Sequence, residues 1–129
     1  MKRNAKIWIA VLLLCFSNSG CHKAQPPTAS GGKQTSYWVA AITNSNMKAR
    51  KRAVFELGNA GAADPIVIPA LTKALKDSDP VVRREAVIAL TKCGKPATDA
   101  RPALIDAQAH DRDSKVRDSA TRALQQLGP

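Results

Sequence analysis

The sequence predicts an all-α fold, a short α-solenoid of about three helix pairs, and three observations lead to it. Hydrophobic residues make up 44 % of the 129-residue chain. Aromatic residues make up only 4 %, so the core must be built from small aliphatic side chains, which allow helices to pack closely. A pattern of about 33 residues occurs three times, and in its second half the apolar residues follow the spacing of an α-helix.

The first 20 residues have the order of a secretory signal peptide. Positive charges come first in M-K-R-N-A-K, an apolar run extends from Ile7 to Phe16, and small or polar residues follow from Ser17 to Gly20. The apolar run is about half as long as the ~20 residues that a membrane-spanning helix needs. A permanent membrane span and a buried helix of the folded domain are therefore the weaker interpretations, and we expect export.

The end of this segment resembles the lipobox of bacterial lipoproteins. The resemblance rests on Ser19-Gly20-Cys21 and implies that Cys21 is acylated and becomes the new N-terminus. Asn18 departs from the pattern of that family, in which an aliphatic residue is usual, so cleaved export without a lipid remains the alternative. The expected location is the cell envelope, on its periplasmic or extracellular face, with the lipid on Cys21 as the membrane anchor.

Residues 21–35 are expected to form the acylation site and a flexible linker. The stretch H-K-A-Q-P-P-T-A-S-G-G-K-Q-T holds a Pro-Pro pair and a Gly-Gly pair and shows no apolar periodicity. Of the three cysteines, Cys15 would leave with the signal peptide and Cys21 would carry the lipid, which leaves Cys93 alone in the folded domain. The sequence therefore excludes a disulfide framework.

Residues 36–128 are expected to form one domain of three units, at about 36–61, 62–94 and 95–128. Each unit combines a first helix, called A, with a second helix, called B. The A helices are carried by Ser36-Tyr37-Trp38, Pro69-Ala70-Leu71 and Pro102-Ala103-Leu104. Five columns agree among the B helices: Asn46, Asp79 and Asp113; Arg50, Arg83 and Arg117; Ala53, Ala86 and Ala120; Leu57, Leu90 and Leu124; and Gly61, Gly94 and Gly128.

The chemistry of these columns explains where each B helix begins and ends. The side-chain oxygens of Asn46, Asp79 and Asp113 can accept hydrogen bonds from the unpaired first-turn amides, worth about 1 kcal/mol each. Each closing glycine is expected to adopt a left-handed conformation that turns the chain back. The shared alanine and leucine lie on one apolar stripe at helical spacing, and Cys93 falls on the same stripe as a core position.

This pattern resembles the HEAT repeat, in particular the short HEAT-like units that are shared with subunits of phycobilin lyases. The middle unit carries the resemblance in P-A-L-T-K-A-L-K-D-S-D-P-V-V-R-R-E-A-V-I-A-L, whereas the first unit lacks the Pro-Ala-Leu. The resemblance implies a right-handed α-solenoid. It also implies a structural ladder between neighbouring repeats, in which a turn aspartate bonds the arginine of a B helix. Carried over to this sequence, the ladder residues are Asp79, Asp113, Arg50, Arg83 and Arg117.

The two ends of the repeat region differ from its middle. The last B helix has polar residues outside its apolar stripe, so we expect it to act as a solvated cap: Lys115, Asp118, Ser119, Thr121, Arg122, Gln125 and Gln126. At the other end, Tyr37 and Trp38 could cover the first unit with large rings. A role of Trp38 in stacking on a ligand is the alternative.

No arrangement in the sequence predicts a catalytic site, so we expect no enzyme and no cofactor. The only histidines are His22, in the linker, and His110, and no nucleophile or base is placed beside them by spacing. His110, Asp111 and Asp113 are a weak metal candidate, because Asp113 is better explained as a helix cap and Asp111 as a solvated loop residue. We therefore expect no metal and no phosphate-binding loop.

Shape and charge remain as the functional features. The chain carries a formal charge of +10, and removal of the signal peptide would leave 17 basic against 10 acidic residues. In HEAT stacks the B helices line the concave surface. The B-helix positions outside stripe and ladder give the candidate partner-binding residues: Lys48, Lys51, Arg52, Phe55, Arg84, Ile88 and Arg122. A charged run is often only a solvated face, but on a repeat scaffold it can also attract an acidic partner.

The sequence thus favours a non-catalytic scaffold that binds another protein at the cell envelope, and an acidic protein is one candidate for that partner. One alternative is a nucleic-acid-binding HEAT-like module, which the basic charge supports and the predicted export opposes. Another is an accessory subunit of an enzyme such as a phycobilin-type lyase, which the resemblance of the repeat permits without implying the chemistry.

Overall fold

The computed structural model describes residues 33–129. The predicted signal peptide at 1–20, the acylation site Cys21 and most of the predicted linker lie outside the described residues. Within residues 33–129, no helix is both long enough and apolar enough to cross a membrane.

Six α-helices and two short 3₁₀ helices make up the described part of the chain. The A helices are α1 (Lys33–Ala41), α3 (Val67–Ala74) and α5 (Arg101–His110), and the B helices are α2 (Met47–Ala60), α4 (Pro80–Cys93) and α6 (Ser114–Leu127). The 3₁₀ helices η1 (Gly61–Ala63) and η2 (Lys95–Ala100) follow α2 and α4 and lead into the next A helix.

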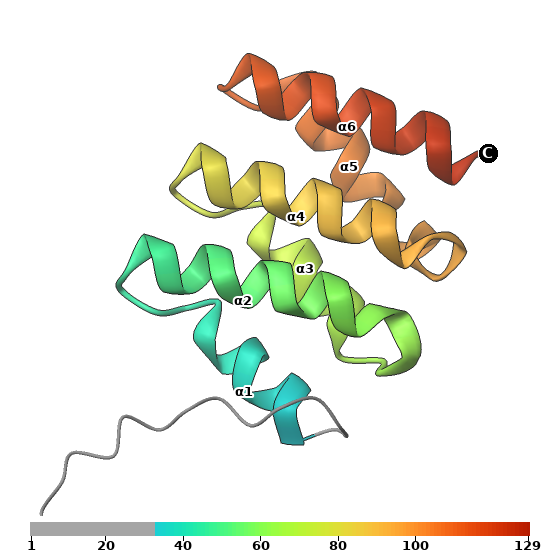
Figure 1. Ribbon diagram of the computed structural model, residues 1–129. Helices are drawn as coiled ribbons and strands as arrows, with labels where there is room; N and C mark the ends of the chain where they lie inside the picture. The colour runs from blue at the N-terminus through green and yellow to red at the C-terminus, as the bar shows by residue number, and fades with distance from the viewer. Residues whose placement is uncertain (1–32) are drawn as a thin grey trace, which may run out of the picture.

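The helix pairs stack on one another in sequence order. The B helices α2, α4 and α6 lie side by side in one layer, and the A helices lie behind them in a second layer (Figure 1). Within each layer a repeat contacts only its neighbours, as is typical of a solenoid. The predicted fold class, an all-α right-handed solenoid of about three helix pairs, is confirmed.

The N-termini of the B helices are capped as the sequence predicts. The Asn46 side-chain oxygen accepts from the amides of Lys48 at 2.8 Å and Ala49 at 3.4 Å. The Asp79 carboxylate accepts from the amide of Val81 at 2.8 Å, and the Asp113 carboxylate accepts from the amide of Val116 at 3.1 Å. Each cap satisfies first-turn amides that have no partner within the helix.

The glycines that end the B helices have positive φ, as predicted, but their ψ differs from that of a left-handed helix. Gly61 has φ 71° and ψ −172°, Gly94 has φ 66° and ψ −143°, and Gly128 has φ 74° and ψ −176°. This extended region at positive φ is available almost only to glycine, because a Cβ would clash with the backbone there. The chain therefore leaves each B helix through a step that no other residue takes without strain.

The core lies between the two layers and is built from the predicted aliphatic stripe. Leu57 and Leu90 are fully buried, and Cys93 is half-buried against the same core. Trp38 is buried at the start of the stack, with 9 % of its surface exposed, and the Tyr37 ring stands edge-on to it with ring centroids 4.9 Å apart. Trp38 therefore packs into the first unit, whereas Tyr37 remains 51 % exposed on the surface.

Candidate functional site

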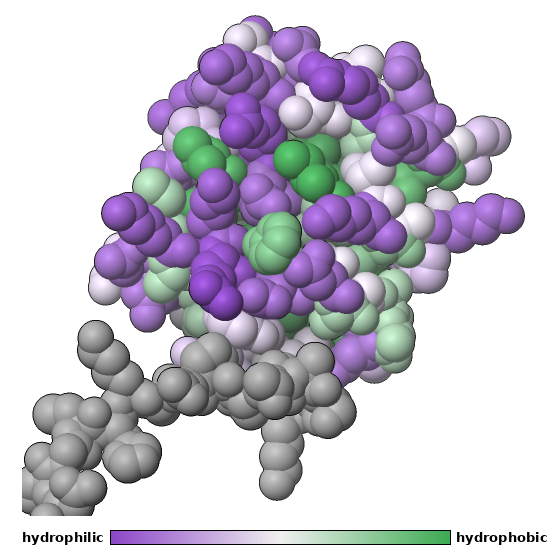
Figure 2. Space-filling model, in the orientation of Figure 1, coloured by the Kyte–Doolittle hydropathy of each residue, from purple (hydrophilic) through white to green (hydrophobic). Residues whose placement is uncertain are grey.

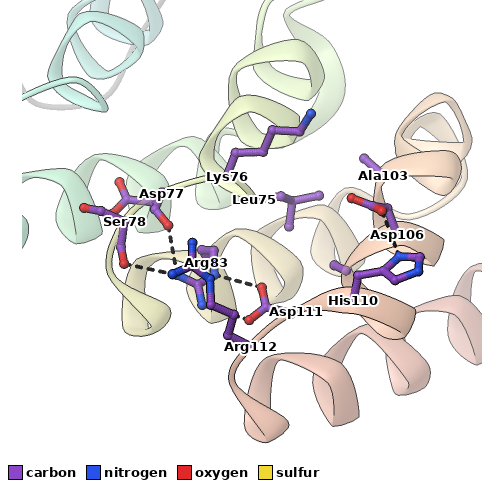
Figure 3. A pocket seen from close by; sticks show the side chains of 11 residues that line it. Leu75, Lys76, Asp77, Ser78, Arg83, Ala103, Asp106, His110, Asp111 and Arg112 are labelled. Atoms are coloured by element: carbon purple, nitrogen blue, oxygen red, sulfur yellow. Dashed lines mark hydrogen bonds and ion pairs between the residues drawn. The ribbon is translucent and has the colours of Figure 1, made fainter.

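The arginine column ties neighbouring repeats together. Arg83 lies in α4, and its Nε and Nη2 atoms donate to the two carboxylate oxygens of Asp111, each at 2.8 Å (Figure 3). Its Nη1 atom donates to the backbone carbonyls of Asp77 at 2.9 Å and Ser78 at 3.2 Å. A bidentate pair of this kind fixes both distance and angle between the two elements that carry it.

Arg50, in α2, repeats this geometry one unit earlier, where it holds Asp77 at 2.7 and 2.9 Å. Arg117, in α6, makes only the local half of the arrangement: its Nη1 atom donates to the carbonyls of Asp111 at 2.7 Å and Arg112 at 3.3 Å. Among residues 33–129, Arg117 makes no ion pair with a carboxylate. The ladder therefore has two charged rungs in the described part of the chain.

The ladder carboxylates are Asp77 and Asp111, so the predicted pairing through Asp79 and Asp113 is wrong. The carboxylates of Asp79 and Asp113 are occupied by the first-turn amides that they cap. Asp77 and Asp111 lie two residues earlier, and each also accepts at 2.9 Å from the amide of the capping aspartate that follows. The sequence held a signal for these residues, because the same polar residue occurs twice in each turn: N-S-N at 44–46, D-S-D at 77–79 and D-R-D at 111–113.

Electrostatics keep both ladder carboxylates ionised. Burial would raise the pKa of Asp77, but the hydrogen bonds from Arg50 and from the amide of Asp79, together with nearby positive charge, outweigh it and lower the pKa. The hydrogen bond from Arg83 is the main cause that lowers the pKa of Asp111. The pairs are well shielded from solvent, so these aspartates are structural anchors of the stack.

The residues of the weak metal candidate are engaged elsewhere. Asp111 is held by Arg83, and Asp113 caps α6. The Nδ1 atom of His110 lies 3.1 Å from a carboxylate oxygen of Asp106, beside a cavity of about 300 Å³ (Figure 3). Within the part of the chain that the structure describes, no group of three or more His, Cys, Asp or Glu side chains is placed to hold a metal ion.

The predicted partner-binding residues lie together on the outer side of the B-helix layer. This surface, called the B-helix face, comprises Lys48, Lys51, Arg52 and Phe55 of α2, Val81, Arg84 and Ile88 of α4, and Lys115 and Arg122 of α6. All of these residues are exposed except Arg84, which is half-buried. Figure 2 shows the face from the front, with apolar patches in the middle of it and hydrophilic residues around them.

Large apolar side chains form the centre of the B-helix face. Phe55 is 43 % exposed, Ile88 is 40 % exposed and Val81 is 36 % exposed. The ammonium group of Lys92 lies 4.9 Å from the centroid of the Phe55 ring, which holds the ring against α4 through a cation–π contact. Sequence reasoning did not select Lys92, which occupies the position in its repeat that Asn59 occupies in the repeat before it.

Most cations of the B-helix face have no acidic partner within the described residues. Arg52 is paired with Glu56 at 3.3 Å in its own helix, an exposed contact of small energetic value. Lys48, Lys51, Arg84, Lys115 and Arg122 make no ion pair in residues 33–129. The face thus combines a solvent-exposed apolar centre with positive charges that are free to meet a partner.

A groove of about 400 Å³ extends this face between α4 and α6. Its walls come from Val87, Ile88 and Thr91 on one side and from Ser119 and Ala123 on the other. Lys92, Arg122 and Gln126 also line it. Sequence reasoning missed this groove, because its presence depends on how far apart two helices lie.

Comparisons with known proteins agree with this geometry. The chain matches the family described as HEAT repeats over residues 35–125. Among solved structures it is similar to the complex of CpcE and CpcF of phycocyanin lyase from Nostoc sp. PCC7120, with 28 % identity and a TM-score of 0.65 over 78 % of this chain and 40 % of that one. The chain therefore spans less than half of the length of that relative.

Two engineered proteins share the fold. They are 24 % and 25 % identical to this chain, with TM-scores of 0.57 and 0.55. The matches cover 74 % and 71 % of this chain and 46 % and 45 % of those proteins. No curated protein sequence matches the chain.

Proposed function

This chain belongs to the HEAT-repeat family, and from that premise we propose that it is a scaffold that binds another protein through its B-helix face at the cell envelope. The observation that carries the proposal is the composition of this face. Phe55 and Ile88 are exposed at its centre, and the cations around them include five that make no ion pair within residues 33–129. An exposed apolar patch with a polar rim is typical of a protein-binding surface.

The rigidity of the stack supports this function. Arg50 and Arg83 each join two repeats through a bidentate ion pair, so the three B helices present their side chains in fixed register. Binding to a surface that is already fixed costs less conformational entropy than binding to flexible loops that become ordered only in the complex. The positive charge would favour an acidic partner and raise its rate of association.

We further propose that the protein does no chemistry of its own. The carboxylates nearest to arginines serve the ladder, Asp79 and Asp113 serve as helix caps, and burial raises the pKa of the Cys93 thiol. A raised pKa keeps the thiol protonated near neutral pH and so disfavours its use as a nucleophile. The side chains of the types that usually form active sites therefore already have structural roles in this fold.

The location is proposed from residues 1–21 alone, which lie outside the described part of the chain. Their order of positive, apolar and small residues supports export, and Ser19-Gly20-Cys21 supports a lipid on Cys21. A scaffold held by such an anchor would act on partners at the membrane surface.

Crosslinking in the native cells tests this function. A photo-crosslinking residue replaces Lys51, on the B-helix face, and a matched variant carries it at Ile105, which is exposed on α5 in the other layer. We expect a discrete membrane-fraction protein to be captured from position 51 and not from position 105. With Cys21→Ala, the captured complex should move to the soluble fraction or disappear. Capture of nucleic acid or cytoplasmic proteins, unchanged by Cys21→Ala, would refute the export and scaffold assignments.

A second candidate function rests on the structural similarity to the phycocyanin lyase complex, at 28 % identity. Under this alternative the chain is an accessory subunit that binds a second subunit of an enzyme. Purification from the native cells distinguishes the two, because an accessory subunit of a pigment lyase should co-purify with visible absorbance. A colourless preparation with a stable protein partner would favour the scaffold.

A further inference from the structure

The two seams between neighbouring B helices differ, although the repeats are alike. In the seam between α2 and α4, a Cβ added to Gly58 would lie 2.8 Å from the Cβ of Ala89, so the two helices are already in close contact. Phe55 lies over the same seam, with Lys92 against its ring at 4.9 Å. This first seam is therefore closed by a glycine contact and an aromatic side chain.

The seam between α4 and α6 lacks both features. At the repeat period of 33 residues Thr91 takes the position of Gly58, and at 34 residues Ala123 takes that of Ala89. Thr91 therefore has a branched side chain where Gly58 has no side chain. The Thr91 hydroxyl donates to the carbonyl of Val87 at 2.8 Å. The groove of about 400 Å³ lies at this second seam, where no ring equivalent to Phe55 fills it.

The lining of the groove defines what it can accept. Val87, Ile88 and Ala123 give it an apolar floor, and Arg122 places a cation at its rim. Lys92 also lines it, although its ammonium group contacts the Phe55 ring and donates to the side-chain oxygen of Asn59 at 3.4 Å. Among the residues that the structure describes, no acidic side chain lines it. A cavity of about 150 Å³ is enough to hold a benzene ring, so this groove has room for a large apolar side chain.

We propose that the groove between α4 and α6 accepts one aromatic or large aliphatic side chain from an acidic segment of the partner protein, with carboxylates of that segment meeting Lys92 and Arg122. The inference rests on the proposed protein-binding function and specifies its ligand. The seam between α2 and α4 already contains an aromatic side chain of this chain, because there the Phe55 ring lies against the ammonium group of Lys92. In the open seam the partner supplies the ring.

Charge argues for this occupant over two others. A second copy of the exported chain is strongly basic, with 17 basic against 10 acidic residues, and would bring its own cations against Lys92 and Arg122. The first 32 residues of this chain contain no aspartate or glutamate, so they too lack the carboxylates that the rim requires. An acidic segment of another protein satisfies both the apolar floor and the charged rim.

Three synthetic peptides test the proposal against the full chain purified in detergent micelles. The first has about 14 residues, or about four helical turns, with one central phenylalanine flanked by glutamates. The second replaces the phenylalanine with serine, and the third replaces the glutamates with lysines. Fluorescence anisotropy should show that the first peptide binds at least about tenfold more tightly than either control.

Variants then place the binding at the groove. Arg122→Glu reverses a rim charge, Ser119→Phe fills the groove from α6, and each should weaken binding of the first peptide at least about tenfold. Lys73→Glu makes the same charge change at an exposed residue of α3, in the other layer and away from the groove, and should weaken binding no more than about threefold. Equal effects of Arg122→Glu and Lys73→Glu, or equal binding of the first and second peptides, would overturn the proposal. Displacement of the peptide by a single-stranded oligonucleotide at equal concentration would overturn it as well.

Failure of this inference is distinguishable from failure of the scaffold function. Capture of an envelope protein from position 51 that persists in the Ser119→Phe variant would leave the scaffold intact and refute the groove as its binding site. Loss of that capture in both Ser119→Phe and Arg122→Glu, with helical content by circular dichroism unchanged, would support the groove. Circular dichroism excludes misfolding as the cause, and the exposed Arg122 side chain makes misfolding least expected in Arg122→Glu.

Discussion

At the scale of single residues, the same arginine column carries two different energetic roles. Arg83 neutralises the shielded carboxylate of Asp111, whereas Arg117 donates only to backbone carbonyls within residues 33–129. Removing a partner from a buried ion pair leaves an uncompensated charge, which is more costly than losing hydrogen bonds to neutral acceptors.

Arg83→Ala is therefore expected to lower the free energy of unfolding more than Arg117→Ala. The expected costs are about 3 kcal/mol for Arg83→Ala and about 1 kcal/mol for Arg117→Ala. Urea denaturation followed by circular dichroism measures both. Equal costs for the two variants would show that the ion pair to Asp111 adds nothing beyond the local hydrogen bonds.

The ladder carboxylates also predict how stability depends on pH. The folded pKa values of Asp77 and Asp111 are lowered, so below neutral pH the unfolded state binds more protons than the folded state. Their contribution to stability is fully present above the unfolded pKa of about 4 and is lost as the pH falls through the lower folded pKa.

The unfolding free energy should accordingly fall as the pH drops below about 4, and the double variant Asp77→Asn with Asp111→Asn should show a smaller fall. Urea titrations at a series of pH values measure the two slopes. Asp79→Asn is the matched control, because an asparagine can still cap α4 and Asp79 does not take part in the ion pairs of the ladder. An unchanged slope in the double variant would contradict the electrostatic account.

Sequence reasoning reached part of this residue chemistry. The spacing of Arg50, Arg83 and Arg117 predicted a structural column, and the helix caps were predicted correctly. The carboxylate partners were not, because the D-S-D doublet at 77–79 offers two aspartates in the same turn. Only the three-dimensional path of the turn decides that Asp77 points to the preceding arginine and Asp79 to its own helix.

At the scale of the helices, packing distance is set by side chains that the repeat pattern does not constrain. The B helices could be predicted closely, since each has a polar cap, an apolar stripe and a closing glycine. The A helices α3 and α5 lack a side-chain cap, and α3 has only eight residues, so sequence gives less information about where they begin. The spacing between B helices depends on Gly58 in one seam and Thr91 in the next.

Gly58→Ala tests this dependence. Alanine favours a helix over glycine by about 1 kcal/mol, but the added Cβ would lie 2.8 Å from the Cβ and 3.0 Å from the Cα of Ala89. We expect overpacking to prevail and the variant to lose about 1–2 kcal/mol in net stability, measured by urea denaturation.

The double variant Gly58→Ala with Ala89→Gly is the matched control, since it returns one of the two methyl groups that collide. The two changes should be less destabilising together than the sum of the single changes. Additive effects would mean that α2 and α4 separate without cost, and that the closed seam is not held by this contact.

At the scale of the whole molecule, the stack determines both stability and surface. The fold class and the exposed positions of the B-helix face follow from the repeat pattern, because side chains outside the stripe and the ladder have to face solvent. The groove between α4 and α6 does not follow from it. That groove arises because Thr91 stands in one repeat where Gly58 stands in the preceding one. The effect of such a difference can be predicted only when the packing of the neighbouring helices is known.

The interdependence of the repeats leads to a prediction for the entire fold. A chain that stops after Gly94 lacks η2, α5 and α6 and would expose Val87 and Leu90, which are almost completely buried in the full stack. It would also leave Arg83 without Asp111. Two repeats bury too little apolar surface to offset the conformational entropy that folding costs, and about three are needed for a stable stack. The truncated chain should therefore lose its cooperative thermal transition in circular dichroism.

A chain that stops after Gly128 is the control for this truncation, and it should keep the transition of the full chain. The Gly128 carbonyl accepts a hydrogen bond from Arg101, so this shorter loss preserves the contact that ties the end of α6 to α5. If the chain that stops after Gly94 melted at the same temperature as the full chain, the repeats would be folding independently. The fixed register of the B-helix face would then have to come from within each repeat, because the ladder and the shared core act only between neighbouring repeats.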